Sequence, residues 1–416
     1  MLNQPIARLL AAAAAGMLRL PPRTPAMTAI TPGEHIHFSR AEFAARQRDT
    51  LAAMRGAGLS ALLVFRQESM YWLSGYDTFG YVFFQCLVLT DDGRMALLTR
   101  APDRLQARFT SVIEDIEIWV DGPDAAPATQ LRAILARLGC AGRTLGVEWD
   151  SYGLTARNGQ RLTAALDGFA TLADASELVS RLRVVKSPAE LDYVRRAAAL
   201  ADDALDAAER ATMPGAFEGD ILADMQAAVF SGGGDDPANE YIIGSGPGAL
   251  MCRYFTGRRH LAAEDQLTLE FAGAYRHYHA ALMRTFLVGT PDPRLVSMHG
   301  ACSEALLAAE AALRPGEPLG AVFDAHARTL DAHGLRAHRL NACGYALGTT
   351  YAPNWMDFPM LFAGQTMAAA PGMVFFIHII VFDATAGLAM TLGRTSLVTE
   401  RGATPLSRGS IGLTLR

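Results

Sequence analysis

Glu270, His279 and His378 are side chains in the C-terminal half of the chain whose types could carry acid–base chemistry. A carboxylate can activate water as a general base or attack a substrate directly, and a histidine can pass protons near neutral pH. Glu270 follows a strand pattern in which Leu267 and Leu269 point to the opposite face. His378 stands among apolar neighbours, so it needs a hydrogen-bond partner or stays neutral. The alternatives are a surface glutamate, a turn histidine and a core histidine.

The elements that must position these residues are those of a two-domain α/β protein. Ser39 can cap a helix that ends near Gly56, and a buried strand follows over residues 59–65. Further strands are predicted over residues 82–90, 94–99 and 144–147, with a helix over residues 128–138. Because strands interleaved with helices indicate an α/β domain, we predict one in this half of the chain.

The boundary between the domains is predicted just before a long helix. Ser187 suits the N-cap, Pro188 suits the first helical position, and Glu190 completes a capping box. Apolar residues such as Leu191 and Val194 then recur at helical spacing. The predicted divisions are a disordered extension at residues 1–35, an N-terminal domain at residues 36–175 and a C-terminal catalytic domain at residues 176–416.

Several segments resemble the pita-bread hydrolases, which include proline-specific aminopeptidases and dipeptidases, creatinase and ectoine hydrolase. The segments are Tyr71-Trp-Leu-Ser-Gly75, Lys186-Ser-Pro-Ala-Glu190, Leu267-Thr-Leu-Glu-Phe-Ala-Gly273 and Gly344-Tyr-Ala-Leu-Gly348. The resemblance spans roughly residues 38–410. It implies an α/β (α+β) fold class, with a creatinase-like N-terminal domain followed by a pita-bread domain. It also implies a homodimer.

The metal-ligand positions of the related metallopeptidases hold unsuitable residues in this chain. The resemblance places the five ligands at Glu270, Ala281, Tyr345 and His378, and on or next to Gly393. A two-metal site needs carboxylates to bridge two cations about 3.5–4 Å apart. One glutamate, one histidine and one tyrosine cannot do this, so we predict neither a metal nor another cofactor.

The resemblance to creatinase and ectoine hydrolase, which act without metal, implies a metal-independent hydrolase. Its substrate would be a small carboxylate-bearing nitrogen compound, cleaved at a C–N bond with Glu270 as base or nucleophile. The predicted catalytic residues are Glu270, His279, Tyr345 and His378. The predicted substrate-binding residues are Arg253, Tyr254, Arg284, Trp355, Phe79 and Tyr81. The alternatives are a Xaa-Pro metallopeptidase and a non-catalytic binding module.

The composition limits the partners. Half of the 416 residues are hydrophobic, 19% are charged and the net charge is −5, which gives no basic surface for nucleic acid. Nothing approaches the roughly 18 apolar residues of a membrane span. The five cysteines are scattered and fit reduced thiols in a cytoplasm, and Cys343 beside Tyr345 is more typical of a small buried filler than of a nucleophile. We therefore predict a cytoplasmic protein with a small-molecule substrate.

Overall fold

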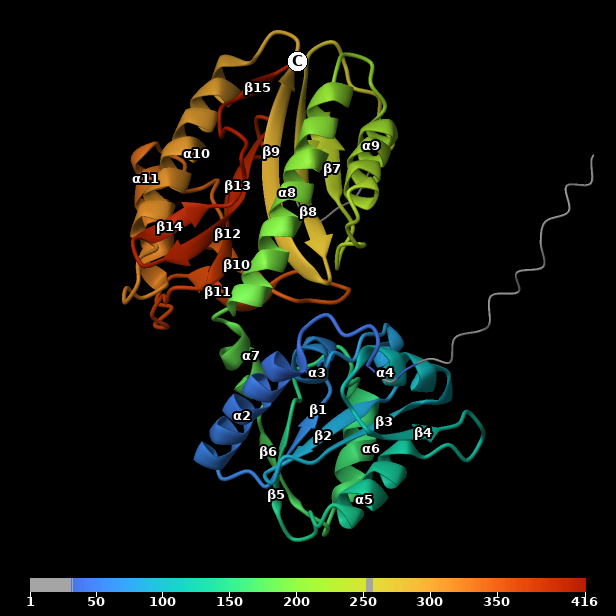
Figure 1. Cartoon of the computed structure of the whole chain (residues 1–416). Coiled ribbons are helices and arrows are strands. Elements are labelled where there is room, and N and C mark those ends of the chain that lie inside the picture. The colour runs from blue at the N-terminus through green and yellow to red at the C-terminus, as the bar shows by residue number, and fades with distance from the viewer. Residues whose placement is uncertain (1–30, 32, 252–256) are drawn as a thin grey trace, which may run out of the picture.

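The computed structural model describes residue 31, residues 33–251 and residues 257–416. The chain forms two sheets, each with its own helices, joined where helix α7 (Leu178–Arg183) leads into helix α8 (Pro188–Ala211) (Figure 1). Gly33 and His35 contact helix α4 (Arg104–Thr110), because their amides donate to the Arg108 carbonyl at 2.9 Å and to the Phe109 carbonyl at 3.2 Å. The domain limits at residues 35 and 175 stay predictions.

The N-terminal unit is built on a mixed six-stranded sheet of order β4-β3-β2-β1-β5-β6. Its strands are β1 (Ala61–Val64), β2 (Cys86–Thr90), β3 (Met95–Arg100), β4 (Asp115–Trp119), β5 (Thr144–Val147) and β6 (Thr171–Asp174). Its other helices are α2 (Arg40–Gly56), α3 (Gln67–Ser74), α5 (Pro127–Arg137) and α6 (Ala156–Leu166). Alternation along β1 explains the layers, because Leu62 and Val64 pack with α2 and α3 whereas Leu63 packs with α5 and α6.

The C-terminal unit is built on an antiparallel sheet of order β11-β10-β12-β13-β9-β8-β7. These strands are β7 (Ile242–Ser245), β8 (Asp265–Tyr275), β9 (Tyr278–Val288), β10 (Ala342–Ala346), β11 (Asp357–Phe362), β12 (Val374–Asp383) and β13 (Leu388–Thr399). Strand β14 (Gly402–Pro405) pairs with β13, and β15 (Thr414–Leu415) pairs with β9. Helices α8, α9 (Glu218–Ser231), α10 (Pro293–Ala312) and α11 (Gly320–Ala332) pack on this sheet (Figure 1).

Helix α8 begins as its sequence predicts. The Ser187 hydroxyl accepts from the Glu190 amide, the Glu190 carboxylate accepts from the Ser187 amide, and Pro188 is the first helical residue. The capping box is therefore confirmed. Helix α2 is likewise capped by Ser39, which accepts from the Glu42 amide at 3.1 Å.

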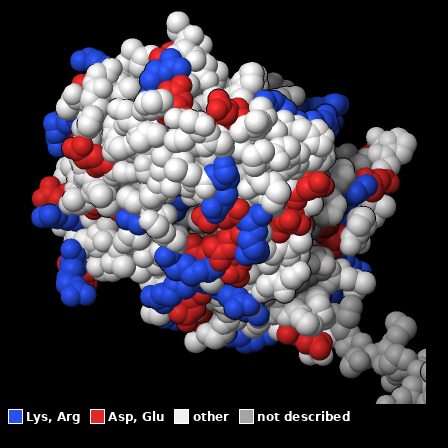
Figure 2. Space-filling model, turned by 90° about the horizontal axis from the view of Figure 1, so that it is seen from above, with Lys and Arg blue, Asp and Glu red and all other residues white. Residues whose placement is uncertain are grey.

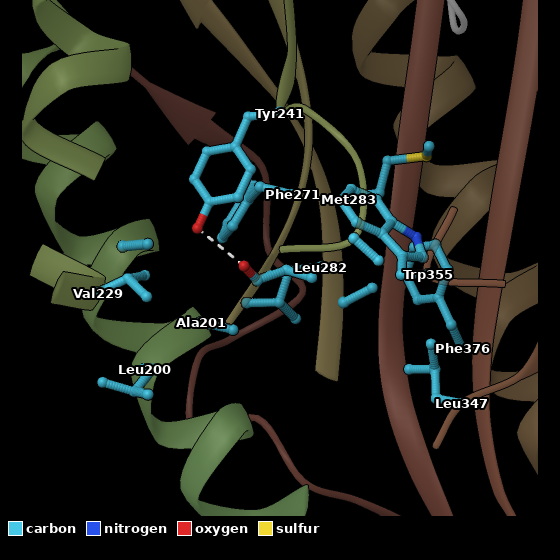
Figure 3. Close-up of a cluster of buried hydrophobic side chains, with 14 of the residues drawn as sticks. Leu200, Ala201, Val229, Tyr241, Phe271, Leu282, Met283, Leu347, Trp355 and Phe376 are labelled. Carbon is cyan, nitrogen blue, oxygen red and sulfur yellow. Dashed lines mark hydrogen bonds between the residues drawn. The ribbon is translucent and has the colours of Figure 1, made fainter. Parts of the chain in front are cut away.

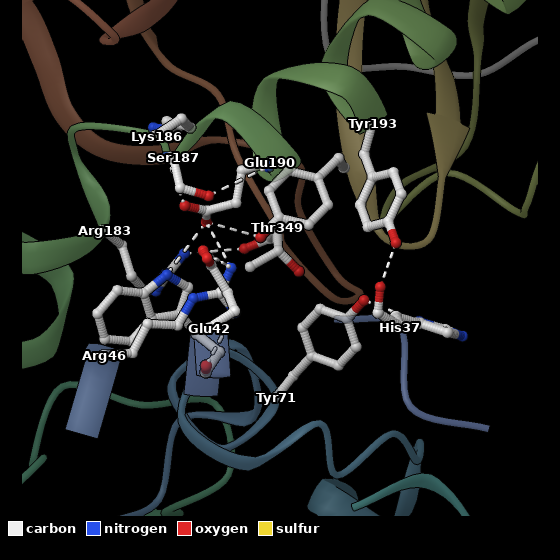
Figure 4. Close-up of polar contacts among 12 residues, drawn as sticks. His37, Glu42, Arg46, Tyr71, Arg183, Lys186, Ser187, Glu190, Tyr193 and Thr349 are labelled. Atoms are coloured by element: carbon white, nitrogen blue, oxygen red, sulfur yellow. Dashed lines mark hydrogen bonds and ion pairs between the residues drawn. The ribbon is translucent and has the colours of Figure 1, made fainter. Parts of the chain in front are cut away.

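Glu190 also joins the two units through its side chain (Figure 4). Its buried carboxylate accepts from Trp72 Nε1 at 3.1 Å and from the Tyr278 hydroxyl at 2.7 Å, and it lies 3.7 Å from the Arg46 guanidinium. A second contact is the buried Arg183, which donates to Asp357 Oδ2 at 2.6 Å. The position of the β8–β9 hairpin is thus set partly by the N-terminal unit.

Charged side chains of both signs are mixed on the face seen in Figure 2. The ion pairs of the described residues include those of Arg408 with Asp203 at 3.0 Å and with Asp206 at 2.6 Å. No helix in the described part of the chain is long and apolar enough to cross a membrane. The four described cysteines, Cys86, Cys140, Cys302 and Cys343, are free and buried. Burial raises the pKa of the Cys343 thiol, which makes it a poor nucleophile.

Candidate functional site

A small cavity of about 60 Å³ lies on the sheet of the C-terminal unit. Its walls come from β7, β8, β10, β12 and three loops, with Asn239, Ile242, Glu270, Leu340, Tyr345, Asn354, Trp355, Met356, His378 and Ile380. A water molecule needs roughly 10–15 Å³ measured in this way, so the space admits a few waters or one small functional group. Five of the ten lining residues are polar and supply one carboxylate, one phenol, one imidazole and two carboxamides.

Glu270 reaches this cavity because of its place on β8. It pairs with Ile242 on β7 and Met283 on β9, so its half-buried side chain stands on a strand that has a neighbour on each side. The Tyr345 hydroxyl donates to Glu270 Oε1 at 3.4 Å. The ring of His378 lies 5.7 Å from the Tyr345 ring, centroid to centroid. Three of the four predicted catalytic side chains therefore meet in one place.

The residues at the remaining metal-ligand positions do not fit a two-metal centre. Ala281 is buried in the same apolar cluster as Met283, Trp355 and Phe376, and the last three lie close together in Figure 3. A Cβ atom added to Gly393 would lie only 2.9 Å from Phe376 Cε2, so a glutamate there would displace that ring. Among the residues that the structure describes, no group of three or more His, Cys, Asp or Glu could hold a metal ion.

His279 does not line the cavity, although the sequence placed it there. It shares a face of the β8–β9 hairpin with Glu270, yet it pairs across the hairpin with Ala274, closer to the turn. The Ala238 amide donates to His279 Nε2 at 3.0 Å, so the imidazole proton is on Nδ1, which lies 3.1 Å from the Thr350 hydroxyl. Burial lowers the pKa of His279 to about 3, with a further contribution from His277. A neutral imidazole with both nitrogens engaged holds two loops together and is poorly placed to shuttle protons.

We expect His279 to make the protein less stable on acidification. The pKa of His279 is about 3 in the folded protein, whereas the ordinary value for histidine, 6.5, applies to the unfolded state. Between these two pH values only the unfolded state binds the proton. The free energy of unfolding therefore falls as the pH falls below 6.5 towards 3, by about 1.4 kcal/mol per unit of pKa difference at most. His279→Gln lacks this contribution, so its stability deficit relative to the wild type should shrink on acidification. Urea denaturation at about pH 7 and about pH 5 measures the change.

His333→Gln is the matched control for this experiment, because His333 is exposed at the end of α11, where its Nε2 lies 2.8 Å from Glu304 Oε2. Any change of its stability difference from the wild type with pH should be small, because an exposed ion pair contributes at most about 1 kcal/mol. A constant difference for His279→Gln as well would contradict the neutral, buried state of His279.

The predicted substrate-binding residues lie in several places. Trp355 lines the cavity, whereas Arg284 points to the other face of β9 and donates to the carbonyls of Met283 at 2.9 Å and Gly393 at 2.7 Å. Burial, followed by Arg394, lowers the pKa of Arg284 to about 10. Arg284 therefore stabilises the pairing of β9 with β13 and does not line the cavity. Arg253 and Tyr254 lie outside the described residues.

Phe79 and Tyr81 lie away from the cavity in the N-terminal unit. The Tyr81 hydroxyl donates to the Ala352 carbonyl at 2.7 Å, which supports the loop that carries Trp355. Phe79 is 77% exposed and borders a separate hollow of about 480 Å³ together with Asp77 and His277. Within a single chain, neither residue is among those that line the cavity beside Glu270.

Two polar residues of the cavity were missed by the sequence analysis. Asn239 lies in the loop between α9 and β7, and its Oδ1 accepts from the Trp355 amide at 3.2 Å. Asn354 precedes Trp355, and its Oδ1 accepts from the Met356 amide at 3.0 Å. Asn354 stands next to Trp355, which was a predicted substrate-binding residue, so Asn354 could have been found from the sequence. Nothing in the local pattern around Asn239 indicates a role.

Comparison with known proteins places this geometry in a family. Residues 192–400 match the model of metallopeptidase family M24, and residues 46–185 match that of the creatinase/prolidase N-terminal domain. Ectoine hydrolase of Halomonas elongata is 27% identical over 387 residues, covering 89% of this chain and 96% of that protein. A probable dipeptidase PepE of Mycobacterium tuberculosis is 28% identical over 346 residues, covering 82% of this chain and 88% of that protein.

The solved structures agree on the fold. Dipeptidase PepE from Mycobacterium ulcerans superposes with a TM-score of 0.79 at 25% identity, covering 91% of this chain and 99% of that one. The mixed sheet of the N-terminal unit and the antiparallel sheet of the C-terminal unit thus confirm the expected fold class. The chain belongs to metallopeptidase family M24, and a creatinase/prolidase N-terminal domain precedes its family domain.

Proposed function

We propose that the protein is a metal-independent hydrolase that cleaves a C–N bond in a small, carboxylate-bearing nitrogen compound. The observation that carries the proposal is the cavity in which the Glu270 carboxylate meets Tyr345 and His378, while apolar side chains pack around Ala281 and Gly393. The 27% identity to an ectoine hydrolase supports the same class of reaction.

The reaction needs a group that removes a proton and a group that supplies one. As a general base, Glu270 takes a proton from water, and the water oxygen bonds to the carbon as the C–N bond breaks. As a nucleophile, its carboxylate oxygen bonds to that carbon as the C–N bond breaks, and water then hydrolyses the resulting ester, which releases the product and restores the carboxylate. His378 lines the same cavity and can return a proton to the leaving nitrogen, while Tyr345 orients the carboxylate. Both routes consume one water and leave the net charge balanced.

We also propose that the enzyme works as a cytoplasmic homodimer without a cofactor. Phe79, Val82 and Phe83 are 77%, 54% and 39% exposed on the N-terminal unit, and this apolar surface is suited to contact with a second copy. Light scattering at working concentration tests the assembly, and a species of one chain mass, 44.6 kDa, would contradict it.

The second candidate function is a metal-dependent dipeptidase, which the 28% identity to the probable dipeptidase PepE favours. A peptidase of that kind would need the two-metal donors that Ala281, Tyr345 and Gly393 do not supply. Cyclic amidines, guanidino acids and Xaa-Pro dipeptides are therefore the substrates to assay side by side.

We expect turnover to survive chelation. A carboxylate base or nucleophile requires no metal, so dialysis against EDTA should leave the rate on the active substrate unchanged. Metal analysis of the dialysed protein completes the measurement. Manganese, zinc or iron retained near one equivalent, together with a rate that EDTA removes and metal restores, would favour the dipeptidase.

A further inference from the structure

A chain of hydrogen bonds runs from Trp355 through Tyr345 to Glu270. Trp355 Nε1 donates to the Tyr345 hydroxyl at 2.8 Å, and that hydroxyl donates to Glu270 Oε1 at 3.4 Å. Trp355 and Tyr345 are 1% and 3% exposed, so water does not compete for the first of these bonds. The second bond is long, as hydrogen bonds to catalytic groups often are before a substrate binds.

The chemistry of the three groups determines which of them donates and which accepts in each hydrogen bond. An indole N–H can only donate, so the Tyr345 oxygen must act as the acceptor from Trp355. The phenol then keeps its own proton for donation, and the carboxylate beside it is an acceptor. Hydrogen bonds in such a row polarise one another, and the bond to the charged group is strengthened.

The position of Trp355 is itself fixed. Its backbone amide donates to Asn239 Oδ1 at 3.2 Å, and its ring lies beside Met283 and Phe376 in the apolar cluster (Figure 3). The indole therefore has little freedom to turn away from Tyr345. The loop that carries it is also held by Tyr81, through the Ala352 carbonyl.

We propose that Trp355 is a positioning residue that directs the Tyr345 hydroxyl towards the Glu270 carboxylate. The effect of these hydrogen bonds on catalysis rests on the proposed function, because it requires Glu270 to be the reacting group. The hydrogen bonds themselves form without any substrate. Through them Trp355, which also packs in the apolar cluster, sets the orientation of the carboxylate.

The test is a mutant cycle read by the indole N–H resonances in a 1H–15N spectrum of the full protein. Loss of one signal in Trp355→Phe assigns the Trp355 resonance. Glu270→Gln should move that resonance when Tyr345 is present, and should leave it unmoved in the Tyr345→Phe background. Trp119, whose Nε1 donates to the Phe84 carbonyl at 2.8 Å, serves as the internal reference.

Tyr241→Phe is the matched control. It removes a buried hydroxyl that donates at 2.8 Å to the carbonyl of Ala272 on β8, the strand that also carries Glu270. It should leave the Trp355 signal in place. An equal response to Glu270→Gln with and without the Tyr345 hydroxyl would overturn the proposal, since the effect would then pass through packing. No response in either background would overturn it as well.

Kinetics separate this inference from the proposed function. With an active substrate, Trp355→Phe and Tyr345→Phe should each lower kcat, on the order of 10-fold for a lost hydrogen bond near a charge, with little change in KM. A full rate in Glu270→Gln would remove the proposed function while leaving the spectroscopic cycle intact. A change in KM alone for Trp355→Phe would assign that residue to substrate contact and overturn its positioning role.

Discussion

Glu270→Gln is expected to lower turnover by at least about 10²-fold, the usual loss when a general base or nucleophile is removed. Glutamine keeps nearly the same shape and can still accept from Tyr345, but it has no basic oxygen. The protein should therefore fold normally and bind its substrate while losing the chemical step. Steady-state kinetics on the active substrate, with circular dichroism as the check on folding, measure this result.

Glu264→Gln is the control for this substitution, because Glu264 is exposed and lies just before the same strand, β8. It removes the same charge from the chain outside the cavity and should leave kcat unchanged. A Glu270→Gln protein that keeps most of its rate would instead favour the non-catalytic role for Glu270 and return attention to His378.

Glu190→Ala is expected to reduce the free energy of unfolding by about 3–5 kcal/mol, the cost of breaking a buried ion pair by removing one partner. Trp72 Nε1, the Tyr278 hydroxyl and the Ser187 amide all donate to this carboxylate, at 3.1, 2.7 and 2.9 Å. Alanine leaves these buried donors without their acceptor. Urea denaturation followed by tryptophan fluorescence gives the difference.

Two variants of α8 separate the role of Glu190 from a general effect on the helix. Glu190→Gln keeps an acceptor for Trp72 and Tyr278 and should be less harmful than alanine. Asp192→Ala removes an exposed ion pair with Arg195, whose worth is at most about 1 kcal/mol. Equal losses for Glu190→Ala and Asp192→Ala would show that the contact between the units contributes little.

Several of the helices and strands could be predicted from the sequence, because the signals that indicate them act over short distances. The capping box of Ser187 and Glu190 joins residues three apart, and the alternation around Glu270 depends on neighbouring side chains alone. The resemblance then brought Glu270, Tyr345 and His378 into one expected site, and the structure places them around one cavity. A strand or helix pattern of this kind survives in almost any tertiary context.

The roles of His279, Arg284 and Trp355 were decided by the tertiary structure. Alternation placed His279 on the correct face of its strand, but only the approach of Ala238 and Thr350 from two other loops shows that both ring nitrogens are occupied. Tyr345 and Glu270, which are joined by a hydrogen bond, are 75 positions apart in the sequence, and Trp355 and Asn239 are 116 positions apart. Such contacts depend on how loops cross the sheet, and no local periodicity encodes that.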